Sequence, residues 1–229
     1  MIVEDDMRSD VQAHSMLSLI GQGCHRLSEI AGRIGKPVGH LSRPLAQLID
    51  LGYIRRDMPF GETTRSTKRT LYRLNDPFLA FWYRYVQPHR SMLEQDRMDI
   101  VFAEYEKMQT HHIAGIWEDL ARKSVAKIDI AGLVWKPAQP WWGNGLDGKP
   151  IEIDVMTESV DGEALLIGEV KWGKKTGVAA IKDRLMKKAG QVPAARTKRL
   201  ILACWARHPM RDAAGITIIR PNDVMAALR

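Results

Sequence analysis

Residues 151–171 constrain the fold most strongly, because two alternating apolar runs flank the dipeptide Asp161-Gly162. An Asp-Gly pair tolerates positive φ at both central positions of a type I′ turn, so the pattern predicts a β-hairpin with these two residues as its loop. Pairing outward from this loop places Asp154 directly opposite Glu169. Opposed residues point to the same face of a hairpin, with Cβ atoms roughly 4.5–5.5 Å apart.

The same register places Glu152 opposite Lys171, so carboxylates and an ammonium group are expected on one patch of the sheet. Like charges set face to face destabilise a sheet, and a bound Mg²⁺, or Mn²⁺ in its place, removes that repulsion. Leu165 and Ile167 share the face of Glu169, which is typical of a half-buried cleft with an apolar floor. The alternative is an exposed hairpin face with solvated charges.

Two motifs in this hairpin resemble the Asp…Glu-x-Lys core of the restriction-endonuclease-like, or PD-(D/E)XK, nuclease superfamily: Glu152-Ile-Asp154 and Gly168-Glu169-Val170-Lys171-Trp172. The superfamily also has a glutamate on a preceding helix, which corresponds here to Glu118. The chain departs from the superfamily pattern in one respect, since no proline precedes Asp154.

This resemblance implies a catalytic metal site with Mg²⁺ as the cofactor. Its ligands would be Asp154, Glu169, the carbonyl of Val170 and an assisting Glu118. Lys171 would stabilise the attacking water or the developing charge. For Glu118, a solvated glutamate on a helix surface remains the alternative.

Over residues 15–205 the chain is similar to the C-terminal region of a prokaryotic family of AAA-type ATPases, often called archaeal ATPases. The most specific part is residues 72–83, Tyr-Arg-Leu-Asn-Asp-Pro-Phe-Leu-Ala-Phe-Trp-Tyr. In that family a winged helix and a DUF234-type, nuclease-like domain follow the ATPase. The resemblance implies an ATPase partner or a missing ATPase domain. The chain has no Gly-x-x-x-x-Gly-Lys-Ser/Thr phosphate loop, so we do not expect it to hydrolyse ATP by that route.

Apolar periodicity predicts three helices before residue 52, followed by strands at 53–58 and 70–74. This order is typical of a winged helix-turn-helix, whose third helix enters the major groove of DNA. Three residues of that helix are then expected near base edges: His40, Arg43 and Gln47. Three residues of the wing are expected at phosphates: Arg65, Lys68 and Arg69. A protein-interaction or lever module of the same shape is the alternative.

Proline positions and apolar spacing predict further helix boundaries and one core-facing stripe. Pro44 disfavours a helix interior, so Ser42 is expected as the N-cap of a shortened third helix. Asp76-Pro77 predicts the start of the next helix, with further helices near 92–108 and 113–125. Aromatic residues at helical spacing predict a core-facing stripe formed by Phe78, Phe81, Trp82 and Tyr85.

Positive charge is concentrated in two blocks of the chain. Residues 26–90 contain 12 Lys+Arg against 5 Asp+Glu, and residues 171–211 contain 12 against 1, although the whole chain has a net charge of only +7. Such separation is typical of a protein with a polyanionic partner, so we expect duplex or branched DNA to bind. In the second block, Lys174 and Lys175 are further candidates for contacting nucleic acid. Solvated basic faces without a partner are the alternative.

These patterns predict an α/β (α+β) chain of four parts. Residues 1–13 are expected to be a flexible tail, 14–75 a winged helix-turn-helix, 76–109 a helical connector, and 110–229 a mixed-sheet, restriction-endonuclease-like (PD-(D/E)XK) domain.

Several other classes of protein are disfavoured. No apolar run approaches the ~20 residues of a membrane span, and the acidic N-terminus is not that of a signal peptide, so we expect a cytoplasmic protein without membrane contact. Cys24 and Cys204 have neither disulfide nor metal-ligand spacing. His111 and His112 are adjacent, so on a helix they point about 100° apart and do not suit one metal ion.

The functional hypothesis is a DNA-binding protein with a Mg²⁺-dependent phosphodiesterase site of the PD-(D/E)XK kind. The alternative is a non-catalytic DNA-binding, regulatory or partner-binding module of an ATPase, in which the nuclease-like fold is only a scaffold.

Overall fold

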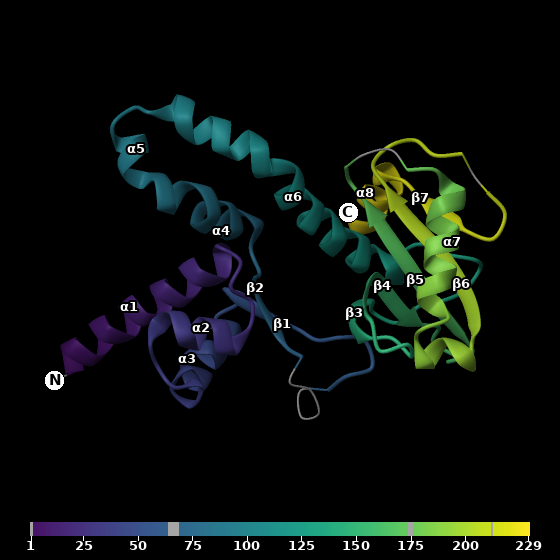
Figure 1. Ribbon diagram of the computed structural model, residues 1–229, viewed down its shortest axis with the longest axis horizontal. Coiled ribbons are helices and arrows are strands. Elements are labelled where there is room, and N and C mark those ends of the chain that lie inside the picture. Colours follow the sequence, from purple (N-terminus) through teal and green to yellow (C-terminus); the bar gives the residue numbers. More distant parts are fainter. Residues whose placement is uncertain (1, 64–68, 174–175, 212) are drawn as a thin grey trace. The chain divides into compact units, whose positions relative to one another are not determined.

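The computed structural model describes residues 2–63, 69–173, 176–211 and 213–229 (Figure 1). These residues form two compact units. Unit 1 contains residues 2–57 and 69–109, and unit 2 contains residues 58–63 and the described residues from 110 onward. Each unit has a hydrophobic core of its own.

Unit 1 begins with helices and a two-stranded antiparallel sheet: α1 (Ile2–Gly21), α2 (Leu27–Ile34), α3 (Val38–Asp50), β1 (Ile54–Asp57) and β2 (Leu71–Leu74). The apolar stripes of the helices meet in one core with the inner residues of the sheet. In the sheet, Ile54 pairs with Leu74 and Asp57 with Leu71. Helical backbone starts at Ile2, well before the apolar residues near Ser15 that indicated the first helix.

The third helix is longer than the sequence pattern predicted. It starts at Val38 rather than after Ser42, and Pro44 lies inside it. Proline has no N–H, so one intrahelical hydrogen bond is missing there. Apolar residues on both sides of Pro44 anchor the helix to the core: Leu41, Leu45 and Leu48. Their burial offsets the local cost of the proline.

Helical segments complete unit 1: α4 (Pro77–Phe81), the π-helix η1 (Trp82–Val86), the 3₁₀-helix η2 (Gln87–His89), α5 (Arg90–Glu94) and the first part of α6 (Met98–Ser124). Asp76 caps α4 as predicted, because its Oδ1 accepts hydrogen bonds from the N–H groups of Phe78 at 2.6 Å and Leu79 at 3.2 Å.

The predicted aromatic stripe is only partly buried. Phe78 and Trp82 are exposed, whereas Tyr83 and Tyr85 are buried. The stripe assumed α-helical spacing throughout, but α-helix ends at Phe81 and a π-helix follows, with hydrogen bonds that span one residue more. This change of period rotates different side chains toward the core.

The helices predicted near 92–108 and 113–125 are not two separate helices. The chain turns at Asp96, whose φ of 57° is left-handed, and α6 then runs without a break for 27 residues. Residues 98–109 of α6 belong to unit 1 and residues 110–124 to unit 2.

Unit 2 contains a mixed five-stranded sheet in the order β3-β4-β5-β6-β7. The antiparallel part is β3 (Gln139–Asn144), β4 (Pro150–Glu158) and β5 (Ala164–Lys171). The parallel part joins β5 to β6 (Arg199–Ala206) and β7 (Thr217–Ile219). Helical segments precede, separate and follow the strands: η3 (Val125–Lys127), α7 (Val178–Ala189), η4 (Pro193–Arg196) and α8 (Pro221–Leu228).

The register of the predicted hairpin is confirmed. Val155 pairs with Gly168 and Glu158 with Leu165, which is the register that a loop centred on Asp161-Gly162 requires. The turn type is different, because only Gly162 has a positive φ, 79°, whereas a type I′ turn needs it at both residues. Hydrogen bonds of Ser159 explain the difference: its carbonyl accepts from the N–H of Gly162 at 2.9 Å.

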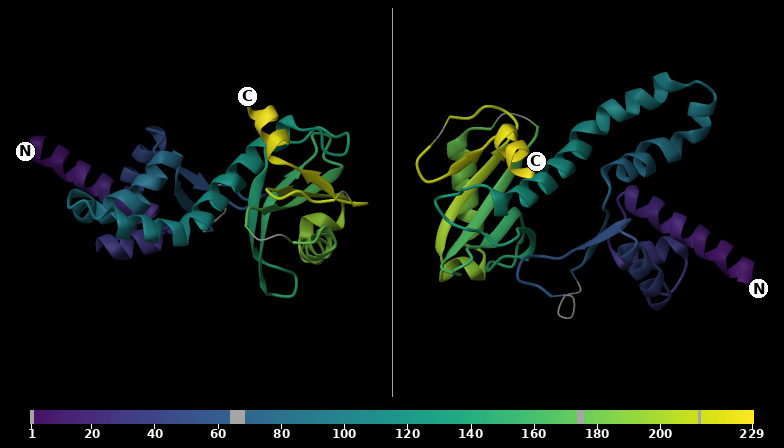
Figure 2. Two further views of the ribbon diagram at one scale, coloured as in Figure 1. Left: turned by 90° about the horizontal axis from the view of Figure 1, so that it is seen from above. Right: turned by 180° about the vertical axis from the view of Figure 1, so that it is seen from behind.

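Both faces of the sheet are covered by helices (Figure 2). On one face, α7 packs through Ile181, Leu185 and Ala189; we call this the α7 face. On the other face lie α8 and the last turns of α6, with Trp117, Ala121 and Val224 in the core. Unit 2 is therefore a three-layer arrangement of helix, mixed sheet and helix.

Candidate functional site

Strands β4 and β5 separate at the position of the two acids singled out in the sequence. Their ladder ends with the pair of Val155 and Gly168. At the next residue, Oδ2 of Asp154 accepts a hydrogen bond of 2.7 Å from the N–H of Val170. From there β4 pairs only with β3, and β5 with β6. The two strands form a fork, with Asp154 on one branch and Glu169 on the other.

Asp154 lies at a β-bulge in β4. Relative to β3, β4 has one extra residue between Ile153 and Met156. Both of these residues pack in the core of the α7 face, while Val155 packs in the opposite core. Side chains alternate along a strand, so Asp154 takes the side of Met156, and the bulge turns Ile153 to that side as well. Asp154 therefore lies on the same side of the sheet as Glu169, as the hairpin register predicted.

The predicted opposition of Glu152 and Lys171 is not found. Because β4 leaves β5 at the fork, Glu152 pairs with Trp142 of β3 instead and is exposed. Lys171 remains near the acids through a different contact, since its Nζ forms an ion pair with Oε1 of Glu169.

Glu169 is buried and is surrounded by three cations. Its side chain is 3% exposed. Besides Lys171, Arg184 of α7 contacts it through two nitrogens: Nε donates a hydrogen bond of 2.9 Å to Oε2, and Nη2 lies 2.8 Å from Oε1 as an ion pair without hydrogen-bond geometry. Lys188, one turn further along α7, places its Nζ 3.9 Å from Oε2. Both carboxylate oxygens therefore have cationic partners.

The two acids have pKa values shifted in opposite directions. Burial raises the pKa of Glu169, but the hydrogen bonds from Lys171 and Arg184 outweigh it and hold that pKa below its ordinary value. For Asp154, burial is the largest influence and raises the pKa, and the nearby charge of Glu169 adds to it. The hydrogen bond from Val170 and the charge of Lys188 oppose this rise only in part. Acids with divergent pKa values in one place are typical of functional sites, and also of structural ion-pair networks.

Arg122 of α6 connects Glu118 to this fork. Its Nη1 donates a hydrogen bond of 2.9 Å to the carbonyl of Asp154 and lies 3.8 Å from Oε2 of Glu118, whose side chain is 39% exposed. Its Nη2 pairs with Asp119. Glu118, the glutamate predicted on a helix, therefore contacts Arg122, and Arg122 in turn binds the backbone of Asp154.

The carboxylates suit Mg²⁺ chemically but are not gathered as a metal site. Hard divalent cations take carboxylate and carbonyl oxygens, which is the predicted ligand set. Within the described ranges, however, no three His, Cys, Asp or Glu side chains lie together so that they could hold a metal ion. Glu169 would have to exchange a cationic partner for the metal, and Asp154 already uses one oxygen for Val170.

The candidate DNA-contacting residues of α3 share one exposed face. His40, Arg43 and Gln47 are exposed, at positions i, i+3 and i+7, and lie opposite the buried leucine stripe. Arg69, next to β2, is also exposed. The other predicted contacts lie outside the described residues: Arg65, Lys68, Lys174 and Lys175.

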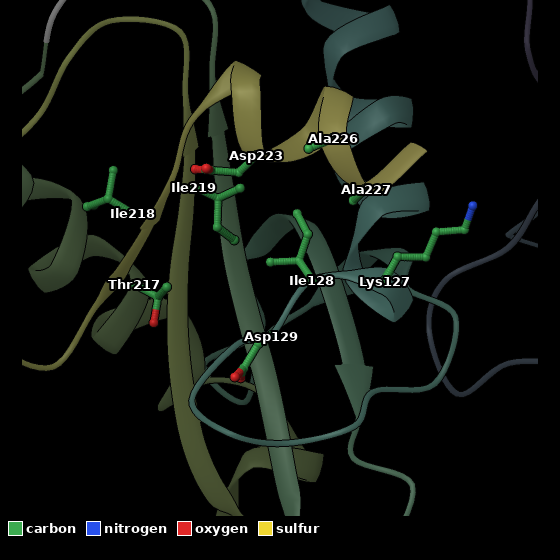
Figure 3. A pocket seen from close by; sticks show the side chains of 9 residues that line it. All are labelled: Lys127, Ile128, Asp129, Thr217, Ile218, Ile219, Asp223, Ala226 and Ala227. Carbon is green, nitrogen blue, oxygen red and sulfur yellow. The ribbon is translucent and has the colours of Figure 1, made fainter. Parts of the chain in front are cut away.

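A separate pocket of about 470 Å³ lies elsewhere in unit 2, lined by η3 with the two residues after it, by β7 and by α8 (Figure 3). Its lining includes none of the fork residues. Two of its acids already serve the local backbone, since Asp129 accepts from the N–H of Gly132 and Asp223 from the N–H of Arg220. We assign no ligand to it.

Sequence reasoning missed the arginines of the site. Arg122 had a weak signal, because it follows two acids at helical spacing, Glu118 and Asp119. Arg184 and Lys188 flank the apolar stripe of α7, but the sequence does not indicate that they meet Glu169.

In the part of the chain that the structure describes, no helix combines the length and apolarity needed to cross a membrane.

Comparison with known proteins relates the site to a family of unassigned function. The model of the DUF234 family, described as "Archaea bacterial proteins of unknown function", matches residues 82–184. The matched segment includes Glu118, Asp154, Glu169, Lys171 and Arg184. An uncharacterized protein of Methanocaldococcus jannaschii is 29% identical over 178 residues, which is 76% of this chain and 37% of that protein. The chain thus spans little more than a third of this relative, and its fork and both flanking helices lie largely in a segment similar to the DUF234 family.

Proposed function

We propose that the chain is a DNA-binding protein whose unit 2 has a PD-(D/E)XK-like, Mg²⁺-dependent phosphodiesterase site at the fork. The observation that carries this proposal is the meeting of Asp154 and Glu169 on the α7 face where β4 and β5 part, with Lys171 bound to Glu169. This arrangement is similar to the Asp…Glu-x-Lys core of the resembling nucleases, which supports the proposal.

The energetic cost of this cluster supports a functional origin. Removing charged groups from water costs several kcal/mol per ion, and apolar residues of similar volume often serve the fold as well or better. The neighbouring residues Leu165 and Ile167 are fully buried, so an apolar residue at position 169 would extend their core. A buried acid at that point, beside a second acid with a raised pKa, is better explained by a catalytic role than by a role in packing.

The side chains of the fork have separate roles in this proposal. Asp154 and Glu169 would hold Mg²⁺, with the carbonyl of Val170 and Glu118 as the further predicted ligands. When bound, the metal ion would supply Lewis-acid activation of a phosphodiester and its attacking water. Lys171 would orient that water or stabilise negative charge on the phosphate oxygens. Arg122 positions Asp154 by binding its carbonyl.

Unit 1 would supply DNA affinity. Three helices followed by a two-stranded hairpin have the element order of a winged helix. In such domains the third helix enters the major groove, where the exposed face of α3 would bring His40, Arg43 and Gln47 to base edges. Arg69 and the wing would contact phosphates.

Cleavage assays on the whole chain test the phosphodiesterase. Labelled duplex, branched and single-stranded DNA would be incubated with Mg²⁺ or Mn²⁺, or with EDTA. We expect metal-dependent cleavage that Lys171→Ala and Asp154→Asn each reduce by about 10²-fold or more, the usual effect of removing a charge-stabilising catalytic group. Cleavage that survives both changes would falsify the assignment, and so would its absence from the wild type under every condition.

A second function, DNA or partner binding without catalysis, is favoured by one specific observation. Both oxygens of Glu169 are already satisfied by cations, which is what a structural ion-pair network would require. Tight DNA binding without cleavage supports this scaffold function. The partnership with an ATPase remains part of this second proposal, and binding to a co-expressed ATPase of the resembling family would test it.

A further inference from the structure

The three cations around Glu169 lie between this acid and solvent. The side chain of Glu169 is 3% exposed, whereas those of Lys188, Lys171 and Arg184 are 22%, 32% and 41% exposed. Each of the three cationic side chains is therefore more exposed than the acid that it contacts. A ligand that approaches Glu169 from this side meets ammonium and guanidinium groups first.

This cluster contains more positive than negative charge. Even with both Asp154 and Glu169 ionised, three cations face two carboxylates. Lys171 and Arg184 have the more exposed side chains of the three, 32% and 41%, although Nη2 of Arg184 is itself buried. Positive charge in a partly buried site attracts anions more strongly than the same charge in open solvent.

Apolar contacts hold helix α7 against the sheet. Ile181, Leu185 and Ala189 fix the helix against the sheet through apolar contacts in a fully buried stripe. Arg184 and Lys188 project from its flank, so they can change partners without moving the backbone. The guanidinium group of Arg184 contacts Glu169 through two nitrogens, and the same two nitrogens can bind two oxygens of a phosphate group.

We propose that Arg184 and Lys188 form a phosphate-binding subsite that holds Glu169 in the resting protein and transfers to a backbone phosphate when nucleic acid binds. This inference rests on the proposed function and specifies its order of events. The phosphate withdraws Arg184 and Lys188 from Glu169, whereas Lys171 stays on Oε1, so Oε2 becomes available to a divalent cation. The resting ion pairs thus oppose metal binding until nucleic acid is present.

The proposal predicts opposite effects of one substitution on two ligands. Arg184→Gln should weaken binding of a short DNA duplex, measured by fluorescence anisotropy in EDTA, by about tenfold, as expected for loss of a phosphate-binding arginine. The same change should tighten binding of Mn²⁺ without DNA, measured by titration calorimetry, by about fivefold, because Glu169 loses a competing cation.

Lys187→Gln is the matched control, since Lys187 is exposed on the same helix and the change removes the same charge. It should alter each affinity by less than about twofold. Arg184→Lys keeps the charge but loses the planar guanidinium group, so its duplex affinity should lie between those of wild type and Arg184→Gln. Circular dichroism verifies folding, and if Arg184→Gln does not fold, the comparison of Arg184→Lys with Lys187→Gln carries the test.

Equal weakening of DNA binding by Arg184→Gln and Lys187→Gln overturns the subsite. Unchanged or weaker Mn²⁺ binding by Arg184→Gln overturns the competition for Glu169. These failures are distinct from failure of the proposed function. A wild type that never cleaves DNA, yet shows both opposite shifts, retains the subsite and loses the phosphodiesterase. A wild type that cleaves, with Arg184→Gln indistinguishable from Lys187→Gln, retains the phosphodiesterase alone.

Discussion

At the scale of single residues, Asp154 is placed where its charge destabilises the fold. Burial raises its pKa above the ordinary value. A group with a raised folded pKa contributes stability that is complete below the unfolded pKa and is lost as pH rises through the folded pKa. At neutral pH this contribution to the free energy of unfolding is smaller, because keeping Asp154 ionised in the folded protein costs free energy.

We therefore expect Asp154→Asn to stabilise unit 2 at pH 7 by about 1 kcal/mol, the usual gain when a functional group under strain is replaced. The amide oxygen can still accept from the N–H of Val170. Urea unfolding can be followed by tryptophan fluorescence, because every tryptophan except Trp82 lies in unit 2. The gain should shrink near pH 3.5, below the ordinary aspartate pKa of about 3.9.

Asp154→Ala is the control for this prediction. It also removes the charge, but it leaves the N–H of Val170 without its acceptor, which costs about 1–3 kcal/mol when the group is buried. The alanine variant should be less stable than the asparagine variant at both pH values. Equal stability of wild type and Asp154→Asn at pH 7 would contradict the strain that we assign to this acid.

At the scale of elements, the hairpin depends on a glycine that permits close packing of β5 on β6. A Cβ at Gly168 would lie 2.5 Å from Cζ3 of Trp205 and 3.1 Å from Cβ of Val155. Gly168→Ala should therefore destabilise unit 2 by about 1–3 kcal/mol through overpacking. The midpoint of urea unfolding measures the change.

Gly115→Ala in α6 is the matched control, because no atom lies within 4 Å of its added Cβ. There the methyl group should stabilise the helix by roughly 0.5–1 kcal/mol, since alanine loses less backbone entropy than glycine. A Gly168→Ala variant as stable as the wild type would show that Trp205 moves aside without cost.

The elements also show which features of the fold the sequence patterns could predict. Period-2 alternation and an Asp-Gly pair specified the hairpin and its register, because a shift of one residue would turn every apolar side chain to the wrong face. The turn type was wrong, since Ser159 provides hydrogen bonds that replace a type I′ geometry. The π-helix at Trp82–Val86 changed the burial of the aromatic residues, and nothing in the apolar pattern indicates where an α-helix adopts that period.

At the scale of the whole molecule, the candidate site combines contacts that are close in sequence with contacts that are not. The fork acids could be placed from one hairpin, because strand pairing relates Asp154 to Glu169 by simple counting. Arg122 and Arg184 lie on helices on opposite sides of the sheet, and their approach depends on how α6 and α7 pack. Sequence periodicity gives the buried face of each helix but not the strand residue that a flanking arginine reaches.

The uneven charge of the chain leads to a prediction for unit 1 that does not depend on the fork. Nucleic-acid affinity falls with salt because each phosphate contact releases counterions, so removing one contacting cation lowers the slope of log K against log salt by about 1. We expect this change for Arg43→Gln, which removes an exposed cation from α3. Lys107→Gln, at an exposed position of α6 in the same unit, should leave the slope unchanged. Fluorescence anisotropy would measure duplex binding of the wild type and both variants at salt concentrations between about 50 and 300 mM. Affinities of this kind fall steeply over roughly that range. If both substitutions lower the slope equally, the interaction is a diffuse attraction to a basic protein, and α3 has no special role in it.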